Sequence, residues 1–317
     1  MSTPLPTGDG NHTMAPLARQ LKSLQRLDIH VTQVEIEGWS KLKYLQAMAP
    51  LYRALGDADV VHGHYGFAGW LARLQLEKPV VVSFMGSDLL GYPDSKGGIT
   101  RSSAVAVKLN RWFARTVSAA IVKSPEMARI IEPVVSHVVP NGIDLEEFAP
   151  LDRSEACARL GWAESPQRVL FAGSPDNPRK GFPLAQAALD ELRKRYREPI
   201  EVVPLHRVAG DRVPVYMSAC DVMILTSHHE GSPNVVKEAM ACNLPVVSVP
   251  VGDVEALFDE VKGYAVVPRE PGALAEALVI ALTGGAPVEG RAAIVEKKLD
   301  LDSVAQRLAS IYQQVLP

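Results

Sequence analysis

The chain has 317 residues, of which 47% are hydrophobic and 22% charged, and its formal net charge is −3. This is the composition of a globular protein with room for two buried cores. The charge balance gives no reason to expect a nucleic acid partner, and no apolar run approaches the roughly 20 residues that a membrane-spanning helix needs. The three cysteines lie far apart without metal-ligand spacing, which is typical of reduced thiols in a cytoplasmic protein.

Ten short runs rich in valine and isoleucine predict strands. They span residues 30–36, 59–64, 79–84, 119–124 and 137–140, and then 168–173, 200–205, 221–227, 245–249 and 264–268. The runs are apolar throughout rather than alternating, so we expect strands that are covered on both faces. Helical patterns lie between them, and this alternation predicts an α/β fold with two Rossmann-like, doubly wound parallel sheets.

The domain boundary is expected in the polar, turn-rich stretch 140–162. We therefore predict an N-terminal domain over 1–150 and a C-terminal domain over 151–301. Residues 302–317 place Val304, Leu308, Ile311 and Val315 on one stripe, which predicts an amphipathic helix that packs elsewhere, back across the cleft between the domains.

The loop after the predicted strand 221–227 carries the first candidate site. Ser232 and Pro233 are expected as the N-cap and first residue of a helix. Glu230 then lies in an exposed loop beside free N–H groups, where burial in a core is not expected, and Glu238 lies on the second turn. Carboxylates in these places suit the paired hydroxyls of a sugar and a ribose. The alternative is a loop glutamate and an unrelated solvated one.

A second loop follows the predicted strand 168–173. Gly173 ends that strand, and Arg179, Lys180 and Gly181 open the next helix. Cations at a helix start are unusual, because the helix dipole there favours anions. A bound diphosphate would explain them, whereas the alternative is an ordinary exposed basic turn.

Three further signals carry less weight. Asp57 and Asp59 form an Asp-x-Asp triplet, but so short a match arises by chance and we expect no metal site. His62 and His64 alternate on a strand and face one side. We interpret His62 as a hydrogen-bonded core residue and leave open whether His64 lines a cleft.

Six basic residues and no acidic one lie between Asp94 and Glu126. We expect a helix there that packs Val105, Leu109, Trp112 and Phe113 into the core and leaves a solvated basic edge. The alternative is a patch that meets anionic lipid headgroups or a lipid-linked acceptor. The edge consists of Lys108, Arg111 and Arg115.

The chain resembles the family 4 retaining glycosyltransferases from about residue 55 to the end. The resemblance rests on their Glu-x7-Glu motif at Glu230 and Glu238 with EAMACNLPVV, on Lys180-Gly181, and on DVVHGHYGFAGWLAR, MGSD and VVPNGID. It implies the GT-B architecture, two facing Rossmann-like domains. It further implies a nucleotide diphosphate sugar as donor substrate, with no cofactor and no metal.

The resemblance also implies roles for individual residues. Glu230, with the amides of Gly231 and Ser232, would hold hydroxyls of the donor sugar, Glu238 the ribose, and Lys180 the departing diphosphate. Asp88 would join Glu230 and Lys180 as a catalytic residue and, with His64, form the acceptor side. The implied donor-binding set is Gly8, Gly10, Gly173, Arg179, Lys180, Glu230, Gly231, Ser232, Pro233, Asn234 and Glu238.

Two positions depart from the family pattern. Ser174 stands where the family often has arginine, and Met85 stands where it often has histidine before Gly-Ser-Asp. A thioether cannot transfer a proton, so no role passes to Met85, while Arg179 could replace the missing arginine.

The implied reaction is sugar transfer with retention of configuration. The leaving phosphate oxygen takes the proton of the acceptor, so no enzymic nucleophile is needed. By family analogy we expect a role in cell-surface polysaccharide or glycolipid synthesis, with a glycan or lipid-linked acceptor, in the cytoplasm and peripherally at the inner membrane face. The alternatives are a non-hydrolysing nucleotide-sugar 2-epimerase and a sugar-nucleotide-binding protein that has lost catalysis.

The start of the chain lacks an expected element. A doubly wound domain opens with an apolar strand, a glycine-bearing loop and a helix, and residues 1–24 resemble the loop and the helix alone. Gly8 and Gly10 would then approach the donor phosphates. We expect that the natural product carries additional residues that form the strand before Met1.

Overall fold

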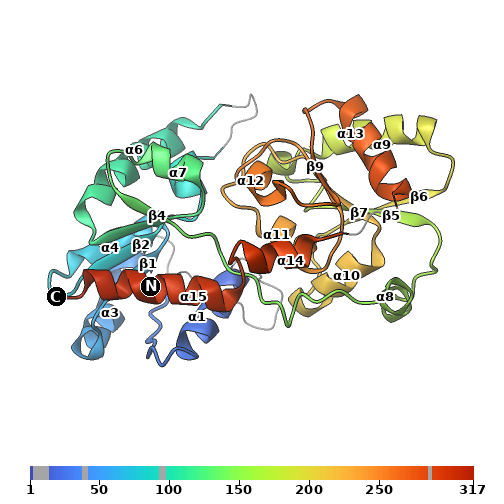
Figure 1. Cartoon of the computed structure of the whole chain (residues 1–317). Coiled ribbons are helices and arrows are strands. Elements are labelled where there is room, and N and C mark those ends of the chain that lie inside the picture. Colours follow the sequence, from blue (N-terminus) through green and yellow to red (C-terminus); the bar gives the residue numbers. More distant parts are fainter. Residues whose placement is uncertain (3–13, 38–41, 93–97, 285–287) are drawn as a thin grey trace. The chain divides into compact units, whose positions relative to one another are not determined.

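The computed structural model describes residues 1–2, 14–37, 42–92, 98–284 and 288–317. The chain divides into two units (Figure 1). The first consists of residues 1–142 together with 301–317, and the second of residues 143–300. The divisions fall at Gly142–Ile143 and at Asp300–Leu301.

The second unit is built on a parallel sheet in the order β6-β5-β7-β8-β9. All five strands predicted from the second half of the sequence are present, which confirms the doubly wound fold. Their bounds are β5 Gln167–Phe171, β6 Ile200–Pro204, β7 Val222–Leu225, β8 Val246–Ser248 and β9 Tyr264–Val266.

Helices cover both faces of this sheet. Leu170 and Met223 pack into a core with α10, α11 and α14, whereas Val169 and Val222 pack on the other face against α9 and α13. Neighbouring residues of one strand thus enter different cores, which explains why the strands are apolar throughout. The helices of this unit are α8 (Arg153–Leu160), η3 (Pro178–Lys180), α9 (Phe182–Arg195), η4 (Gly210–Arg212), α10 (Val213–Ala219), α11 (Asn234–Ala241), α12 (Val254–Phe258), α13 (Pro271–Thr283) and α14 (Gly290–Glu296).

The first unit contains a parallel sheet in the order β1-β2-β3-β4. Its strands are β1 (Val61–His64), β2 (Val80–Ser83), β3 (Ala119–Val122) and β4 (Ser136–Val138). Its helices are α1 (Ala15–Gln25), α2 (Lys43–Gln46), α3 (Met48–Ala54), η1 (Leu55–Asp57), α4 (Gly66–Leu74), α5 (Ser87–Leu90), α6 (Arg101–Phe113), η2 (Ala114–Thr116), α7 (Pro125–Ile130) and α15 (Leu301–Val315). None of the described helices is both long and apolar enough to cross a membrane.

The predicted strand over residues 30–36 is absent, and this prediction was wrong. The segment makes only an isolated parallel bridge, between Glu35 and Ser2. Ser2 N–H donates to the carbonyl of Val34 at 3.2 Å, and Ile36 N–H donates to the carbonyl of Ser2 at 2.8 Å. A strand requires a ladder of such bonds along its length, and residues 29–33 line a cavity where that partner would lie.

The final helix, α15, belongs to the first unit. Val304, Leu308 and Ile311 are buried in one core with Leu24 of α1 and Val81 of β2. An ion pair between Arg26 and Asp302, 2.7 Å apart, joins the same two helices. The predicted amphipathic stripe is therefore the buried face of α15.

Candidate active site

The second unit has a topological switch point between β5 and β7. The chain runs from β5 outward to β6 on one side of the sheet and then returns to β7 on the other side. The loops that follow β5 and β7 therefore leave the same edge of the sheet and lead to α9 and α11, which cover opposite faces of it. Ligands of open α/β sheets bind at such points.

Direct bonds hold these two loops together. The hydroxyl of Thr226, just after β7, lies 3.0 Å from the carbonyl oxygens of both Lys180 and Gly181. The N–H of His228 donates to the carbonyl of Arg179 at 2.8 Å. Gly181 has φ +67°, and a Cβ there would lie 2.3 Å from the carbonyl oxygen of Thr226. Only glycine permits this approach, so the Lys-Gly pair is a packing requirement of the site.

Lys180 and Glu230, which lie 50 residues apart in the sequence, meet at this switch point. The lysine Nζ donates to Glu230 Oε1 at 2.8 Å, and the two side chains are only 15% and 11% exposed. Gly173 makes room for the lysine stem, because a Cβ at that position would lie 3.0 Å from Lys180 Cγ. Glu230 was expected to be exposed in its loop, but the structure buries it against a cation.

The charge state of Glu230 follows from these neighbours. Burial by itself would raise the pKa of the carboxyl, but the positive charges of Lys180 and Arg179 outweigh it and hold the pKa below its ordinary value. Glu230 is therefore a buried carboxylate at neutral pH, able to accept hydrogen bonds but not to donate a proton.

Helix α11 begins at Asn234, so Pro233 takes the N-cap position and Ser232 belongs to the loop. The predicted start at Ser232 and Pro233 was one residue early. The hydroxyl of Ser227 interacts with the Glu230 carboxylate, and the hydroxyl of Ser232 interacts with the carboxylate of Asp253. Both interactions favour the charged form of the carboxyl group.

The backbone of the Glu230 loop is supported from behind by Gly252. This glycine has φ +59°, and a Cβ on it would lie 2.6 Å from the carbonyl oxygen of Gly231 and 3.0 Å from that of Glu230. Any side chain here would push the loop out of place. Gly252 therefore helps to fix the position of Glu230.

Glu238 is half-buried on the second turn of α11. The preceding residue, Lys237, is fully buried. Burial lowers the pKa of Lys237 to about 8, against the opposing effect of the negative charges of Asp253 and Glu238. Sequence reasoning missed this buried lysine, because its neighbours on the predicted helix gave no sign of which face would be covered.

Arg269 is a second residue that sequence reasoning missed. It follows β9 and donates to the carbonyls of Ser227 at 2.8 Å and Thr226 at 3.1 Å, with His228 Nδ1 3.2 Å away. These bonds hold the start of the Glu230 loop. The sequence could have indicated Arg269 as a site residue, because it directly follows the predicted strand 264–268 and the carboxyl ends of parallel strands lie at one edge of the sheet.

Asp88 lies in the first unit and is buried. Its carboxylate accepts hydrogen bonds from the backbone N–H groups of Gly66 at 3.1 Å, Met85 at 3.1 Å and Gly86 at 2.9 Å. Burial raises the pKa of this carboxyl, although these bonds act in the opposite direction. Both carboxylate oxygens accept hydrogen bonds from backbone N–H groups. Asp88 thereby holds the loop after β2 against the start of α4.

Known proteins resemble both halves of the chain. A family model described as Glycosyltransferase Family 4 matches residues 11–147, and one described as Glycosyl transferases group 1 matches residues 155–284. A D-inositol 3-phosphate glycosyltransferase of Actinosynnema mirum is 30% identical over 312 residues, covering 82% of this chain and 73% of that protein. The chain belongs to the GT-B glycosyltransferases.

Solved glycosyltransferase structures share the fold. Sucrose-phosphate synthase of Thermosynechococcus elongatus superposes with a TM-score of 0.71 at 19% identity, covering 90% of this chain and 82% of the other. HepE of Anabaena in complex with UDP-glucose superposes with a TM-score of 0.70 at 20% identity, covering 98% of each chain. The predicted α/β fold with two Rossmann-like domains is confirmed.

The two histidines of β1 in this glycosyltransferase lie on one side of the sheet, as predicted. Their rings stack with centroids 4.2 Å apart. His62 interacts with the hydroxyls of Tyr312, 2.7 Å away, and Ser83, 2.9 Å away, in agreement with its interpretation as a hydrogen-bonded residue. His64 is buried, and burial keeps the pKa of both imidazoles well below the ordinary value.

The remaining predicted residues fall in several places. Gly8 and Gly10 lie outside the described residues. Arg179 and Ser174 are half-buried in the loop after β5, and Ser174 Oγ accepts from the N–H of Asp176 at 3.3 Å. Asp57 lies beside β1, among residues that line a cavity of the first unit.

Helix α6 of the glycosyltransferase differs from the prediction. Of the four apolar residues expected in the core, only Phe113 is buried. Val105 is 58% exposed, Leu109 50% and Trp112 55%, and Lys108 and Arg111 are exposed beside them. The covered face of α6 is instead made by Ser103, Asn110 and Phe113.

Proposed function

We propose that this glycosyltransferase moves a sugar from a nucleotide diphosphate sugar to a hydroxyl group of an acceptor, with retention of configuration. The observation that carries the proposal is the ion pair between Lys180 and Glu230 at the switch point between β5 and β7. HepE, which shares the fold, was solved with UDP-glucose, and this supports a nucleotide sugar as donor.

Lys180 and Arg179 would bind the diphosphate. Both cations stand in the loop after β5, and the Glu230 loop, which Lys180 contacts, leads directly into the first turn of α11. The first N–H groups of a helix have no partner within it and attract phosphate oxygens. The stem of Lys180 passes through the space left by Gly173 and carries the ammonium group to Glu230. A phosphate oxygen could replace Glu230 Oε1 as the acceptor of the Lys180 ammonium group. The lysine would then still be paired with a negative charge.

Glu230 and its loop would bind the donor sugar. A carboxylate of lowered pKa accepts hydrogen bonds from two hydroxyls at once. The amides of Gly231 and Ser232 and the buried hydroxyl of Ser232 are close by in the same loop. Glu238, on the second turn of α11, would accept hydrogen bonds from the hydroxyls of the ribose.

The reaction needs no proton from the protein. The acceptor oxygen forms the new bond to the anomeric carbon, the bond from that carbon to the phosphate oxygen breaks, and the acceptor proton passes to the leaving phosphate. Lys180 stabilises the negative charge that develops on the diphosphate. Asp88 acts by positioning the loop at Met85 and Gly86.

Two measurements on the purified protein test this proposal. A thermal-shift panel of UDP- and GDP-sugars identifies the donor, because a ligand that binds only the native state raises the melting temperature. The donor is then incubated with and without a hydroxyl acceptor. A transferase forms product only with acceptor, whereas conversion of the donor sugar without acceptor would indicate an epimerase and contradict the proposal.

Variants assign the residues. Glu230→Gln should abolish transfer, while Glu276→Gln, a change on the exposed face of α13, should leave it unchanged. Transfer by Glu230→Gln at the wild-type rate would remove Glu230 from the site. Donor binding without any turnover by the wild-type protein, with every acceptor tested, would favour the interpretation as a binding protein that has lost catalysis.

We also propose that α6 meets the anionic surface of a membrane at its inner face, where a lipid-linked or glycan acceptor would be presented. Apolar residues stand exposed beside basic ones on this helix, which is the pattern of helices that lie in a lipid interface. The surface consists of Val105, Lys108, Leu109, Arg111 and Trp112 on α6, together with Arg115 of η2. Such a position would suit polysaccharide or glycolipid synthesis.

A further inference from the structure

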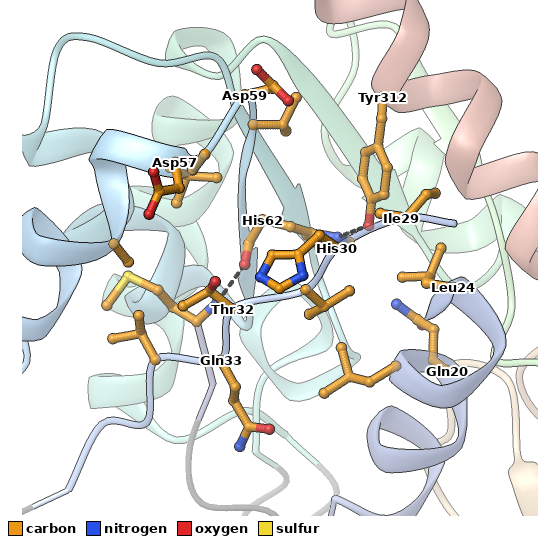
Figure 2. A pocket seen from close by; sticks show the side chains of 18 of the residues that line it. Gln20, Leu24, Ile29, His30, Thr32, Gln33, Asp57, Asp59, His62 and Tyr312 are labelled. Carbon is orange, nitrogen blue, oxygen red and sulfur yellow. Dashed lines mark hydrogen bonds between the residues drawn. The ribbon is translucent and has the colours of Figure 1, made fainter. Parts of the chain in front are cut away.

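A cavity of about 540 Å³ runs beside β1 in the first unit (Figure 2). Its two long walls are segment 29–34 and residues 57–62, which lead into β1. Side chains from three helices line the rest: Leu17, Gln20, Leu21 and Leu24 from α1, Leu51 and Ala54 from α3, and Ala309 and Tyr312 from α15.

Met1 and Ser2 occupy one end of this cavity. The amine of Met1 donates to the carbonyl of His62 at 2.6 Å, and the N–H of His64 donates to the carbonyl of Met1 at 2.9 Å. On the other side, Ser2 bonds to Val34 and Ile36. Met1 and Ser2 therefore lie between the walls, and Ser2 runs parallel to segment 34–36. A chain that continued backward from Met1 in the same direction would lie inside the cavity.

Both walls can offer backbone N–H and carbonyl groups to a chain in the cavity. Backbone groups alternate along a strand, so Val60 directs its backbone to the same side as His62 and His64, toward the line of Met1. On the other wall, the carbonyl of Val34 accepts from Ser2, and the backbone groups of Thr32, two residues earlier, point to the same side. A strand placed between the walls could extend both ladders of hydrogen bonds.

The cavity lies between two apolar layers. Val61 packs into a core with Leu51 and Leu55 on one face of the sheet, while Val60 packs on the other face against the core of Leu24. A strand in the cavity would contact both layers. Its side chains would then be apolar throughout, as in a central strand of a doubly wound sheet.

Two polar groups point to an occupant. Gln20 is 5% exposed, and no partner for its Nε2 is found among the described residues. Figure 2 shows this amide nitrogen directed toward the middle of the cavity. The second group is the amine of Met1, which is buried at the mouth of the cavity against a carbonyl. A peptide N–H at this position would donate the same bond without an ionisable amine that must be buried.

We propose that this cavity is a strand-binding site, and that its occupant is an apolar segment of about six residues joined to Met1 through its amine. The length follows from the six residues of segment 29–34, which span about 20 Å as an extended chain. A joined segment would convert the Met1 amine into a ladder donor. A separate peptide would place its terminus against that amine and lose entropy on association.

The test compares the 317-residue chain with two extended forms. One carries Lys-Val-Ile-Val-Ile-Val before Met1, and the other carries Lys-Pro-Ile-Pro-Ile-Pro. Both additions replace the Met1 amine by a peptide N–H, but proline cannot donate to a ladder. The strand extension should raise the melting temperature by about 5 °C or more. It should also slow amide exchange in residues 30–34 and 58–62 at least about tenfold, while the proline extension should do neither.

Two further arms keep the result interpretable. Gln20→Leu in the extended protein should lose part of the gain, because the glutamine amide would bind the added strand. The free hexapeptide, acetylated and amidated and added at equal concentration, should not protect the 317-residue chain. Equal effects of the two extensions would overturn the proposal, and so would equal protection by the free peptide, which would assign the cavity to a separate partner.

Discussion

Replacing Glu230 by glutamine would leave Lys180 as a cation without its carboxylate, in a site where its side chain is 15% exposed. Exposed ion pairs contribute roughly 0.2–1 kcal/mol, and removing one partner of a fully buried pair costs about 3–5 kcal/mol. The Lys180–Glu230 pair lies between these cases, so we expect Glu230→Gln to lower the free energy of unfolding of the second unit by about 2 kcal/mol. That is a factor of roughly 30 in the unfolding equilibrium.

The same pair predicts a pH dependence. The folded-state pKa of Glu230 lies below its unfolded value near 4.5. Its contribution to stability is therefore fully present above pH 4.5 and is lost as the pH falls through the folded pKa. The difference between wild type and Glu230→Gln should shrink in that acidic range, because the wild-type carboxyl then becomes neutral as well.

The assay is a urea titration read by hydrogen exchange of peptides from β5 and β7, which reports the second unit alone. Lys180→Met and the double variant complete the cycle. We expect the double variant to be more stable than the sum of the two single losses predicts, since it buries no unpaired charge. Additive losses, or a Glu230→Gln protein as stable as wild type at pH 7, would refute the reasoning.

Four further predictions follow from particular contacts. Gly181→Ala should cost more stability than Gly161→Ala, because both glycines have positive φ but only the first would place a Cβ against a carbonyl; equal losses in denaturation would contradict the steric argument. Lys180→Met should weaken binding of a nucleoside diphosphate about ten- to a hundredfold and binding of the nucleoside little, as measured by calorimetry. The 317-residue chain should lose up to about 4 kcal/mol of stability as the pH drops from 8 to 5, because burial lowers the pKa of the Met1 amine to about 5 from 8.0, three units at about 1.36 kcal/mol each. A flat urea midpoint over that range would show the amine to be solvated. Vesicles with anionic lipid should bind the protein and release it with added salt, and binding should fall when Lys108 and Arg111 of α6 and Arg115 of η2 are all neutralised; lack of binding by the wild type would exclude the lipid contact.

The sequence by itself determined nine of the strands and their parallel, doubly wound arrangement. Strands that are covered on both faces must be apolar throughout. Such a run consists of neighbouring residues, so it can be recognised in the sequence without knowledge of the fold. The ends of such strands also located the candidate loops, so Glu230 and Lys180 were singled out as candidate site residues from the sequence alone. Residues 30–36 show the limit of this reading, because a segment with the right composition becomes a strand only where a neighbour completes its ladder.

Only the tertiary structure decided which strands lie side by side. Backbone ladders are the same for every sequence, so periodicity cannot state that β5 lies next to β7. That adjacency brings Lys180 to 2.8 Å from Glu230 and buries both. The exposed apolar face of α6 was equally hidden, because an amphipathic pattern marks two faces without stating which one a neighbour covers.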